Sequence, residues 1–300
     1  MLVVPDKQAL LVKSRNPDKI LNVLPNAKSI TVKGVPLVAV PHRINETRLL
    51  RNLGYNAPAP IRTYYDWPGR FKPFQAQKEA AAFLSMHTRA FNLSELGTGK
   101  SLASLWAYDY LRSIGLLNKA LVISPLSTLE RTWADELFNH FPHLTFGVLH
   151  GPKKKRIALL KEDYDVYVVN HDGVGILEPH LKTRTDIDLV IVDEIAQCAR
   201  NAGTTKWKMI NSVVNRHKEP RACWGMSGTP TPNAPTDAWA QCKLLVPDQV
   251  PPYFGRFKAT VMRQITQFKW IPKPDATETV RKIMQPAVRF TRDECLDLPP

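Results

Sequence analysis

Several features that would place this chain in familiar protein classes are absent. The four cysteines lie far apart, with no C-x-x-C pair and no histidine cluster. That pattern excludes a disulfide framework and a zinc site, and it is typical of reduced cytosolic thiols. No apolar run approaches the roughly 18 residues of a membrane span, and the first residues do not resemble a signal peptide. We therefore expect a soluble cytoplasmic protein with no membrane partner, in the host cytoplasm if the source is a virus.

Acidic residues are scarce. The 27 Asp and Glu face 41 Lys and Arg, which gives a formal net charge of +14 and a pI near 9.7. Such an excess indicates a polyanionic partner, most simply nucleic acid. It is uneven, because residues 1–65 carry ten basic residues against three acidic ones. Two interpretations of this segment stay open: an accessory domain that binds DNA or senses its structure, or a basic cap that only packs on the rest of the protein.

The length of 300 residues suggests about two domains, and a hydrophobic content of 44% is enough for a packed core. Short β-rich runs alternate with polar helical stretches up to residue 55, and the proline-rich residues 56–60 are typical of a linker. Continuous apolar runs then alternate with helical patterns, at residues 90–93, 120–124, 166–170, 189–192 and 222–226. They predict an α/β fold with a mostly parallel sheet covered on both faces.

The sequence S-E-L-G-T-G-K-S at residues 94–101 has the residue types of a phosphate-binding loop. Gly97 and Gly99 allow a tight turn whose N–H groups point at an anion. Lys100 supplies a charge for β- and γ-phosphates, and the Ser101 hydroxyl can ligate Mg²⁺. An apolar run before the loop and helical spacing after it provide the strand–loop–helix context. The full pattern has glycine at its first position, where this chain has serine.

Two adjacent acids, Asp193 and Glu194, follow another apolar strand. In open α/β sheets, ligands bind beyond the carboxyl ends of the strands. One acid of such a pair can hold Mg²⁺ through water, while the other polarises the attacking water. A solvated strand end is the alternative, and the phosphate loop upstream makes it the weaker one.

Three other features are ambiguous by themselves. Residues 227–230 (SGTP) fit two interpretations: a segment whose hydroxyl groups convert the phosphate state of a nucleotide into movement, or a plain turn. The Gln75 amide can read an adenine edge, although a lone glutamine is usually a surface residue. The basic run at residues 153–156 fits a nucleic-acid patch or a solvated helix start. Core packing is the default interpretation for His171, Trp133 and Trp239.

The order and spacing of these segments resemble the SWI/SNF-type DNA-dependent ATPases of the second helicase superfamily. Residues 72–75 resemble the adenine-reading motif of that family, residues 94–101 its phosphate loop, and residues 193–196 its acid box. Five further segments are similar to the family. In chain order they are residues 121–127 together with Trp133 and Glu136, residues 168–171, and residues 226–230 together with Asn233. The last two are Trp239 together with residues 244–247, and residues 289–293 leading into 298–300. The similarity covers residues 71–300. Ala196 departs from it, since the family often has histidine there.

The resemblance implies ATP hydrolysis that drives translocation along duplex or branched DNA, with ATP and Mg²⁺ as cofactors. The ATP-binding residues it implies are Gln75, Gly97, Thr98, Gly99, Lys100 and Ser101. Those implied for catalysis are Lys100, Asp193 and Glu194, with Ser101 and Asp193 as Mg²⁺ ligands. The residues implied to couple the site to DNA are Ser227 and Thr229, and the implied DNA contacts are Ser124, Pro125, Leu126 and His171.

We expect a basic α+β accessory domain at residues 1–65, a RecA-like P-loop lobe at 66–250, and a helical segment at 251–300 leading toward a second lobe. No Q-x-x-G-R-x-x-R occurs in the sequence, so the arginine finger of a second RecA-like lobe would have to come in cis or in trans. The chain is then a fragment, or a protein that ends after one lobe, and weakly active or inactive alone.

Two alternative functions stay open. One is an RNA helicase of the same superfamily, although the acid box of its commonest branch ends in Ala-Asp, unlike Ile195-Ala196 here. The other is a non-catalytic DNA-binding module that keeps a nucleotide site for folding.

Overall fold

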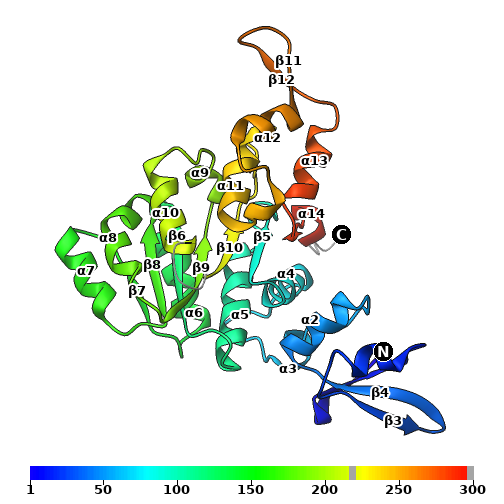
Figure 1. Cartoon of the computed structure of the whole chain (residues 1–300). Coiled ribbons are helices and arrows are strands. Elements are labelled where there is room, and N and C mark those ends of the chain that lie inside the picture. Colours follow the sequence, from blue (N-terminus) through cyan, green and yellow to red (C-terminus); the bar gives the residue numbers. More distant parts are fainter. Residues whose placement is uncertain (216–220, 296–300) are drawn as a thin grey trace. The chain divides into compact units, whose positions relative to one another are not determined.

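The computed structural model describes residues 1–215 and 221–295, which form two compact units, Met1–Trp67 and Pro68–Pro300 (Figure 1). Residues 298–300, which complete the last segment of the family resemblance, lie outside the described residues. The two units are described separately below.

The first unit is built on a four-stranded antiparallel sheet with the order β1-β2-β4-β3. The strands are β1 (Leu2–Val4), β2 (Ala9–Val12), β3 (Lys28–Val32) and β4 (Val35–Pro41), and the helices are α1 (Pro17–Leu21), α2 (Ile44–Asn52) and α3 (Ile61–Tyr64). Alternate residues of β2 and β4 are buried with Ile20 and Leu50 of the helices, because successive strand residues point to opposite faces. The unit has the α+β character expected of this segment.

Residues 56–60 are not a free linker but part of the first unit. Ala57 belongs to its core, and the Arg51 Nε donates to the Ala57 carbonyl at 2.8 Å. The ring of His42 is buried between the Pro58 carbonyl, 2.9 Å from Nε2, and the Tyr64 hydroxyl, 3.0 Å from Nδ1. Burial lowers the pKa of His42.

The second unit is built on a seven-stranded sheet in which every neighbouring pair of strands is parallel. Its strands in spatial order are β13 (Ala287–Val288), β5 (Arg89–Asn92), β10 (Ala222–Met226), β9 (Ile187–Val192), β6 (Lys119–Ser124), β8 (Val166–Asn170) and β7 (Phe146–Val148). The predicted parallel α/β sheet is confirmed. Because all strands run the same way, their carboxyl ends share one edge.

Helices flank this sheet (Figure 1). They are α4 (Gln75–Ser85), α5 (Lys100–Ser113), α6 (Asp135–His140), α7 (Lys153–Lys161), α8 (Val174–Leu181), α9 (Ile195–Cys198), α10 (Thr205–Asn215) and α11 (Ala238–Leu245). Leu121 and Ile123 of β6 pack in the core that contains α8, α10 and α11. The alternate residues Ala120 and Val122 are equally buried, so both faces of the sheet are covered.

Residues 251–295 belong to the second unit and contain strands as well as helices, whereas a helical segment was expected. Helix α12 (Phe254–Val261) leads into the hairpin β11 (Met262–Gln264) and β12 (Trp270–Pro272), and helix α13 (Ala276–Ile283) then returns to the sheet edge at β13. Phe257, Val261 and Val280 belong to the main core. The short helix α14 (Arg292–Cys295) ends the described residues.

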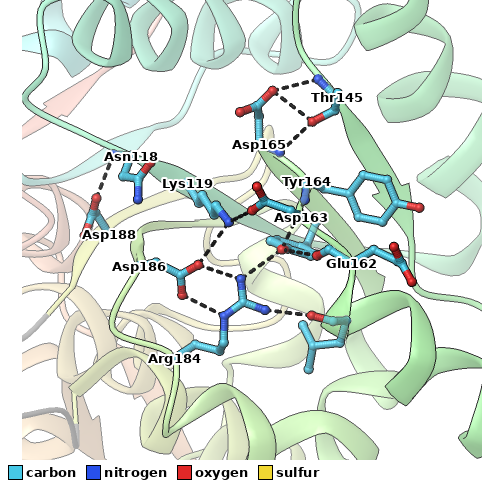
Figure 2. Close-up of polar contacts among 12 residues, drawn as sticks. Asn118, Lys119, Thr145, Glu162, Asp163, Tyr164, Asp165, Arg184, Asp186 and Asp188 are labelled. Atoms are coloured by element: carbon cyan, nitrogen blue, oxygen red, sulfur yellow. Dashed lines mark hydrogen bonds and ion pairs between the residues drawn. The ribbon is translucent and has the colours of Figure 1, made fainter.

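An ionic network lies at the amino ends of the strands, opposite the edge where ligands bind in such sheets (Figure 2). Two guanidinium nitrogens of Arg184 each donate to Asp186 at 2.6 Å. Lys119 pairs with Asp186 at 3.1 Å and also contacts Asp163. These contacts join the starts of β6 and β9, and the hydrogen bonds from Arg184 hold the pKa of Asp186 well below its usual range.

All four cysteines are free, as their spacing predicts, and burial raises the pKa of Cys198, Cys223 and Cys242 to about 12. Among the described residues, no helix combines the length and the apolar character needed to cross a bilayer.

Candidate active site

The phosphate-loop sequence connects the carboxyl end of β5 to the first turn of α5. Gly97 (φ +83°) and Gly99 (φ +73°) occupy the left-handed region that glycine adopts without steric cost. A side chain at Gly99 would also collide with its surroundings, since a Cβ there would lie 2.0 Å from the Gln77 Nε2. The end of the flexible Gln77 side chain could move to relieve that contact, so the positive φ is the main reason for glycine at this position.

Two polar side chains of the loop donate hydrogen bonds to the backbone of the loop itself. The Lys100 Nζ donates to the Glu95 carbonyl at 3.0 Å, and the Thr98 hydroxyl donates to the same oxygen at 2.8 Å. Lys100 is only 9% exposed. Burial lowers the pKa of its ammonium, whereas the charges of Glu194 and Asp193 raise it. The structure thus brings Lys100 and the acid pair together, as the sequence predicts.

The acid pair is held by specific contacts at the carboxyl end of β9. One Asp193 carboxylate oxygen accepts from the Trp133 indole N–H at 3.1 Å, and the other accepts from the backbone N–H of Glu194 at 2.9 Å. Burial is the largest cause of the raised pKa of Asp193. Trp133 is fully buried, so the core-packing interpretation is confirmed, but its N–H also fixes an acid of the site.

Glu194 has an unusual backbone for a residue with a side chain, with φ 46° and ψ 50°. This left-handed conformation is uncommon outside glycine, asparagine and aspartate, and such outliers gather at functional sites. Its pKa is raised first by burial and then by the charge of Asp193. Lys100 and a hydrogen bond with Ser227 act in the opposite direction.

A third carboxylate, which the sequence analysis assigned to a similar segment but to no role, also reaches the site. The Glu136 Oε1 accepts from the Ser101 hydroxyl at 3.3 Å. Burial raises the pKa of Glu136 to about 8. A glutamate on a helix carries no local signal of such a contact, because its partner lies 35 positions away in the sequence.

The expected coupling residues lie at the carboxyl end of β10, beside β5 and β9. Ser227 is fully buried, its N–H donates to the Asn92 carbonyl at 3.2 Å, and its hydroxyl accepts from the Thr229 N–H at 3.2 Å. The Thr229 side chain is exposed. Ser227 therefore contacts the acid box directly through Glu194, whereas Thr229 contacts Ser227 through its backbone.

The two glutamines at the start of α4 have different surroundings. Gln75 is exposed and its amide donates to Glu79 at 2.9 Å. Gln77 is buried, accepts from the Phe74 N–H at 2.9 Å, and lies against Gly99. Gln77 carries no sequence signal of its own apart from its proximity to Gln75, so its contact with the loop could not be predicted.

The residues expected at the DNA face divide into exposed and buried ones. Pro125 is partly exposed and Leu126 is 57% exposed, beyond the end of β6, while Ser124 is buried. His171 is also buried, as core packing predicts, and its Nε2 lies 2.8 Å from the Asp193 carbonyl. Its ring therefore links the end of β8 to the acid box.

The basic run at the start of α7 is likewise divided. Lys153, Lys154 and Lys155 are exposed. Arg156 is buried and donates to the Gly151 carbonyl at 2.7 Å and to the Asn170 side chain at 2.8 Å. Arg156 thus stabilises the fold, and only the three lysines remain available to a partner.

The serine that replaces the first glycine of the pattern has a structural role. The hydroxyl of Ser94 donates to the Asn92 side chain at 2.7 Å and accepts from the Phe290 N–H at 3.1 Å. Glu95 continues this contact, because its N–H donates to the Phe290 carbonyl and its carboxylate accepts from the Arg292 N–H at 3.1 Å. The phosphate loop is therefore attached to the chain that follows β13.

Fold and site together define a RecA-like lobe with a phosphate loop and an acid box. A solved structure of similar fold is the Sulfolobus solfataricus SWI2/SNF2 ATPase core in complex with dsDNA, with a TM-score of 0.62 and 22% identity over 78% of this chain and 48% of that one. The same core domain solved separately matches with a TM-score of 0.57 and 21% identity.

The chain belongs to the SNF2-related domain family, whose model matches residues 74–296. Protein p41 of Acyrthosiphon pisum secondary endosymbiont phage 1 is 29% identical over 49% of this chain and 33% of its own length. The ISWI chromatin-remodeling complex ATPase ISW2 of Saccharomyces cerevisiae is 26% identical over 60% of this chain and 16% of its own length. The chain thus matches a third or less of each of these relatives.

Proposed function

We propose that this chain provides the ATP-binding lobe of a DNA-dependent ATPase that moves along duplex or branched DNA. The observation that carries the proposal is the meeting of the phosphate loop and the acid pair at one sheet edge, with Lys100 under the influence of both acids. Membership of the SNF2-related family supports the same conclusion.

The loop residues and the acid pair have separate roles in this proposal. The N–H groups from Gly97 to Lys100 bind the phosphates, and the Lys100 ammonium pairs with the β- and γ-phosphates. Glu194 orients and polarises the attacking water, for which its raised pKa favours proton acceptance. Gln75 is proposed to read the adenine, with Gln77 fixing the loop beneath it.

The residues at the site fit a magnesium ion. Ser101 and Asp193 offer oxygen ligands, the type that Mg²⁺ prefers, and the nearby Glu136 Oε2 is a buried acceptor with no protein partner in the described part of the chain. A bound Mg²⁺ would neutralise negative charge that develops on the phosphates. Ser101 and Asp193 are therefore proposed to hold it.

Hydrolysis of the nucleotide is proposed to change the DNA-binding loops through direct contacts at the carboxyl edge of the sheet. Ser227 contacts Glu194, and His171 contacts the backbone of Asp193. His171 directly follows β8 and Ser227 directly follows β10, so both lie at the carboxyl edge of the sheet. Ser124, Pro125 and Leu126 form the corresponding loop after β6, where phosphate contacts would make binding sensitive to salt and nearly independent of sequence.

Binding measurements with the 300-residue chain test this proposal. We expect a fluorescent ATP analogue to bind saturably, and labelled duplex DNA to bind more tightly than duplex RNA of the same sequence. Raising the salt concentration should weaken DNA binding linearly on a log–log plot. Tighter binding of RNA would favour the helicase alternative, and DNA binding with no nucleotide binding would favour the non-catalytic module.

A further inference from the structure

Glu136 carries a buried acceptor atom that no group in the described residues satisfies. Its Oε1 accepts from the Ser101 hydroxyl, but its Oε2 is inaccessible to solvent and has no hydrogen-bond partner there. Leaving a buried polar atom unpaired costs about 1–3 kcal/mol, and more for a charged group. Native proteins contain few such atoms, and each requires an explanation such as an ion or a water.

The segment that carries Glu136 has an unusual helical conformation. Residues Leu129–Ala134 form a π-helix, a rare conformation that is frequent at functional sites, and α6 continues directly from it. Trp133 and Glu136 are three residues apart, so they lie on the same face. Trp133 contacts Asp193 and Glu136 contacts Ser101, which are the two residues proposed to hold Mg²⁺.

We propose that Glu136 is a positioning residue of the Mg²⁺ site, an inference that rests on the proposed function. By accepting the hydrogen bond that the Ser101 hydroxyl donates, Glu136 leaves the lone pairs of that hydroxyl free to face the cation. Its Oε2, unpaired among the described residues, would then be available to accept a hydrogen bond from a water that such a cation carries. Partners of this outer-shell kind orient metal ligands and tune the affinity for the metal.

Direct ligation by several carboxylates fits less well than this outer-shell role. Within residues 1–215 and 221–295, no group of three or more His, Cys, Asp or Glu side chains lies close enough to hold a metal ion. Mg²⁺ usually keeps several of its waters and takes only one or two carboxylates from the protein. A water between the cation and Glu136 is therefore the arrangement that matches both the geometry and the ion.

The test is the Mg²⁺ dependence of nucleotide binding in the Glu136→Gln variant of the 300-residue chain. Glutamine keeps nearly the same size but replaces one acceptor oxygen with a donor. We expect affinity for a fluorescent ATP analogue in EDTA to stay within about twofold of wild type. Mg²⁺ should increase the affinity for the analogue, and we call the Mg²⁺ concentration that gives half of this increase the Mg²⁺ midpoint. In Glu136→Gln the Mg²⁺ midpoint should rise by about 10–100-fold.

Glu130→Gln is the matched control, because Glu130 is exposed on the same segment and should leave the Mg²⁺ midpoint unchanged. Ser101→Ala should shift the midpoint, and adding Glu136→Gln to it should shift the midpoint little further, since the two residues act through one contact. If Glu136→Gln does not fold, Glu136→Asp replaces it, and its shorter side chain should also raise the midpoint.

An Mg²⁺ midpoint within twofold of wild type in the folded Glu136 variant would overturn the inference and leave Glu136 a structural residue. That outcome is distinct from failure of the proposed function. In the latter case the wild-type chain itself would bind no nucleotide, with or without Mg²⁺.

Discussion

The backbone of Glu194 is held in a conformation that few residues other than glycine adopt. The turn places its carboxylate near Asp193, Lys100 and Ser227 instead of along the strand direction. Such a strained position is retained when the surrounding contacts determine it, here through the Asp193 carboxylate that accepts its N–H. The backbone conformation thus fits the role proposed for Glu194 in hydrolysis.

Glu194→Gln is expected to separate hydrolysis from binding. In the proposed role the carboxylate acts on water and not on ground-state phosphates, so affinity for ATP should remain within about threefold of wild type. Any hydrolysis that the chain supports should fall by about 10²-fold or more, which is typical for loss of a general base. Single-turnover phosphate release and equilibrium ATP binding measure the two effects. Near-normal turnover in this variant would remove Glu194 from the proposed role.

Local sequence signals pointed to some of the residues that the structure brings together here and not to others. Lys100, Ser101 and Asp193 were selected because the proposed chemistry depends on spacing within one loop or one strand end, and the structure places Lys100 near Asp193. Their roles stay predictions. Glu136 and Gln77 reach the site only through the packing of α6 and α4, which no local pattern encodes. Gln75 was selected by its motif, and the structure places it on the exposed side of α4, so its role stays a prediction.

At the scale of elements, the edge strand β13 and the residues after it are hydrogen-bonded to β5 and to the phosphate loop. It has two residues paired with β5, and its attachment continues through the Phe290 N–H and the hydroxyl of Ser94. The Leu93 N–H also donates to the Val288 carbonyl at 2.8 Å. Changes at the phosphate loop should therefore reach the residues that follow β13.

Ser94→Ala should loosen this attachment. The substitution leaves the Phe290 N–H without its acceptor, at a cost of about 1–3 kcal/mol. Amide exchange at Phe290 should become faster, and the melting temperature should fall. Ser127→Ala is the control, because Ser127 is exposed. Unchanged exchange at Phe290 in Ser94→Ala would show that the hydroxyl does not hold the edge strand.

The network at the amino ends of the strands gives a pH-dependent prediction. The pKa of Asp186 is lowered in the folded state, first by Arg184, so its stabilisation is present above the unfolded pKa of about 3.9. That stabilisation is lost as the pH falls through the lower folded pKa. Asp186→Asn should therefore reduce the free energy of unfolding at pH 7, and the difference from wild type should shrink below about pH 4.

Denaturant unfolding at pH 7, 5 and 3 measures this effect. Asp163→Asn serves as the control, since the Asp163 side chain is 89% exposed and screened by solvent. A difference in unfolding free energy between wild type and Asp186→Asn that stays constant from pH 7 to pH 3 would exclude an ionic origin.

The strands with long apolar runs were predictable from sequence, whereas short edge strands were not. Strands β6, β8, β9 and β10 are buried on both faces, which requires the continuous apolar residues that the sequence displays. Strand β13 is defined by the edge of β5 that it contacts, because two residues carry no periodicity. The packing of residues 56–60 into the first unit was also missed, since prolines mark linkers and packed turns alike.

At the scale of the molecule, the first unit concentrates positive charge on its surface. Lys28 and Lys33 are exposed on the β3–β4 hairpin, whose turn is formed by Lys33 and Gly34. We propose that this unit contacts DNA phosphates, with packing alone as the alternative. The net charge of +14 supports a polyanionic partner without identifying the surface that binds it.

Changing Lys28 and Lys33 together to glutamine should weaken binding to duplex DNA and flatten its salt dependence. The log–log slope should fall by about 0.9 for each phosphate that the protein no longer neutralises. The matched control changes Lys161 and Lys282, two exposed lysines of the second unit, to glutamine. Equal affinities and slopes for wild type and the hairpin variant would exclude this hairpin as a DNA-binding element.

The 300-residue chain should bind ATP but hydrolyse it slowly, because its sequence contains no Q-x-x-G-R-x-x-R that could supply the arginine finger of a second lobe. Such a finger contributes roughly 10³–10⁵ in kcat. Phosphate release with and without duplex DNA measures this. Rapid turnover stimulated by DNA would mean that a finger is supplied in trans or by another residue of this chain.

Equilibrium binding of ATP with Mg²⁺ to the 300-residue chain and to its Lys100→Ala variant tests the proposed ATP site most directly. The Lys100 ammonium is buried in the loop beside two acids, and a charge-assisted hydrogen bond contributes about 1.5–3 kcal/mol. Wild type should bind saturably, Lys100→Ala should bind roughly tenfold more weakly or worse, and the exposed-lysine control Lys161→Ala should match wild type. Equal ATP affinity in wild type and Lys100→Ala, or no binding by either, would contradict an ATP site at this loop.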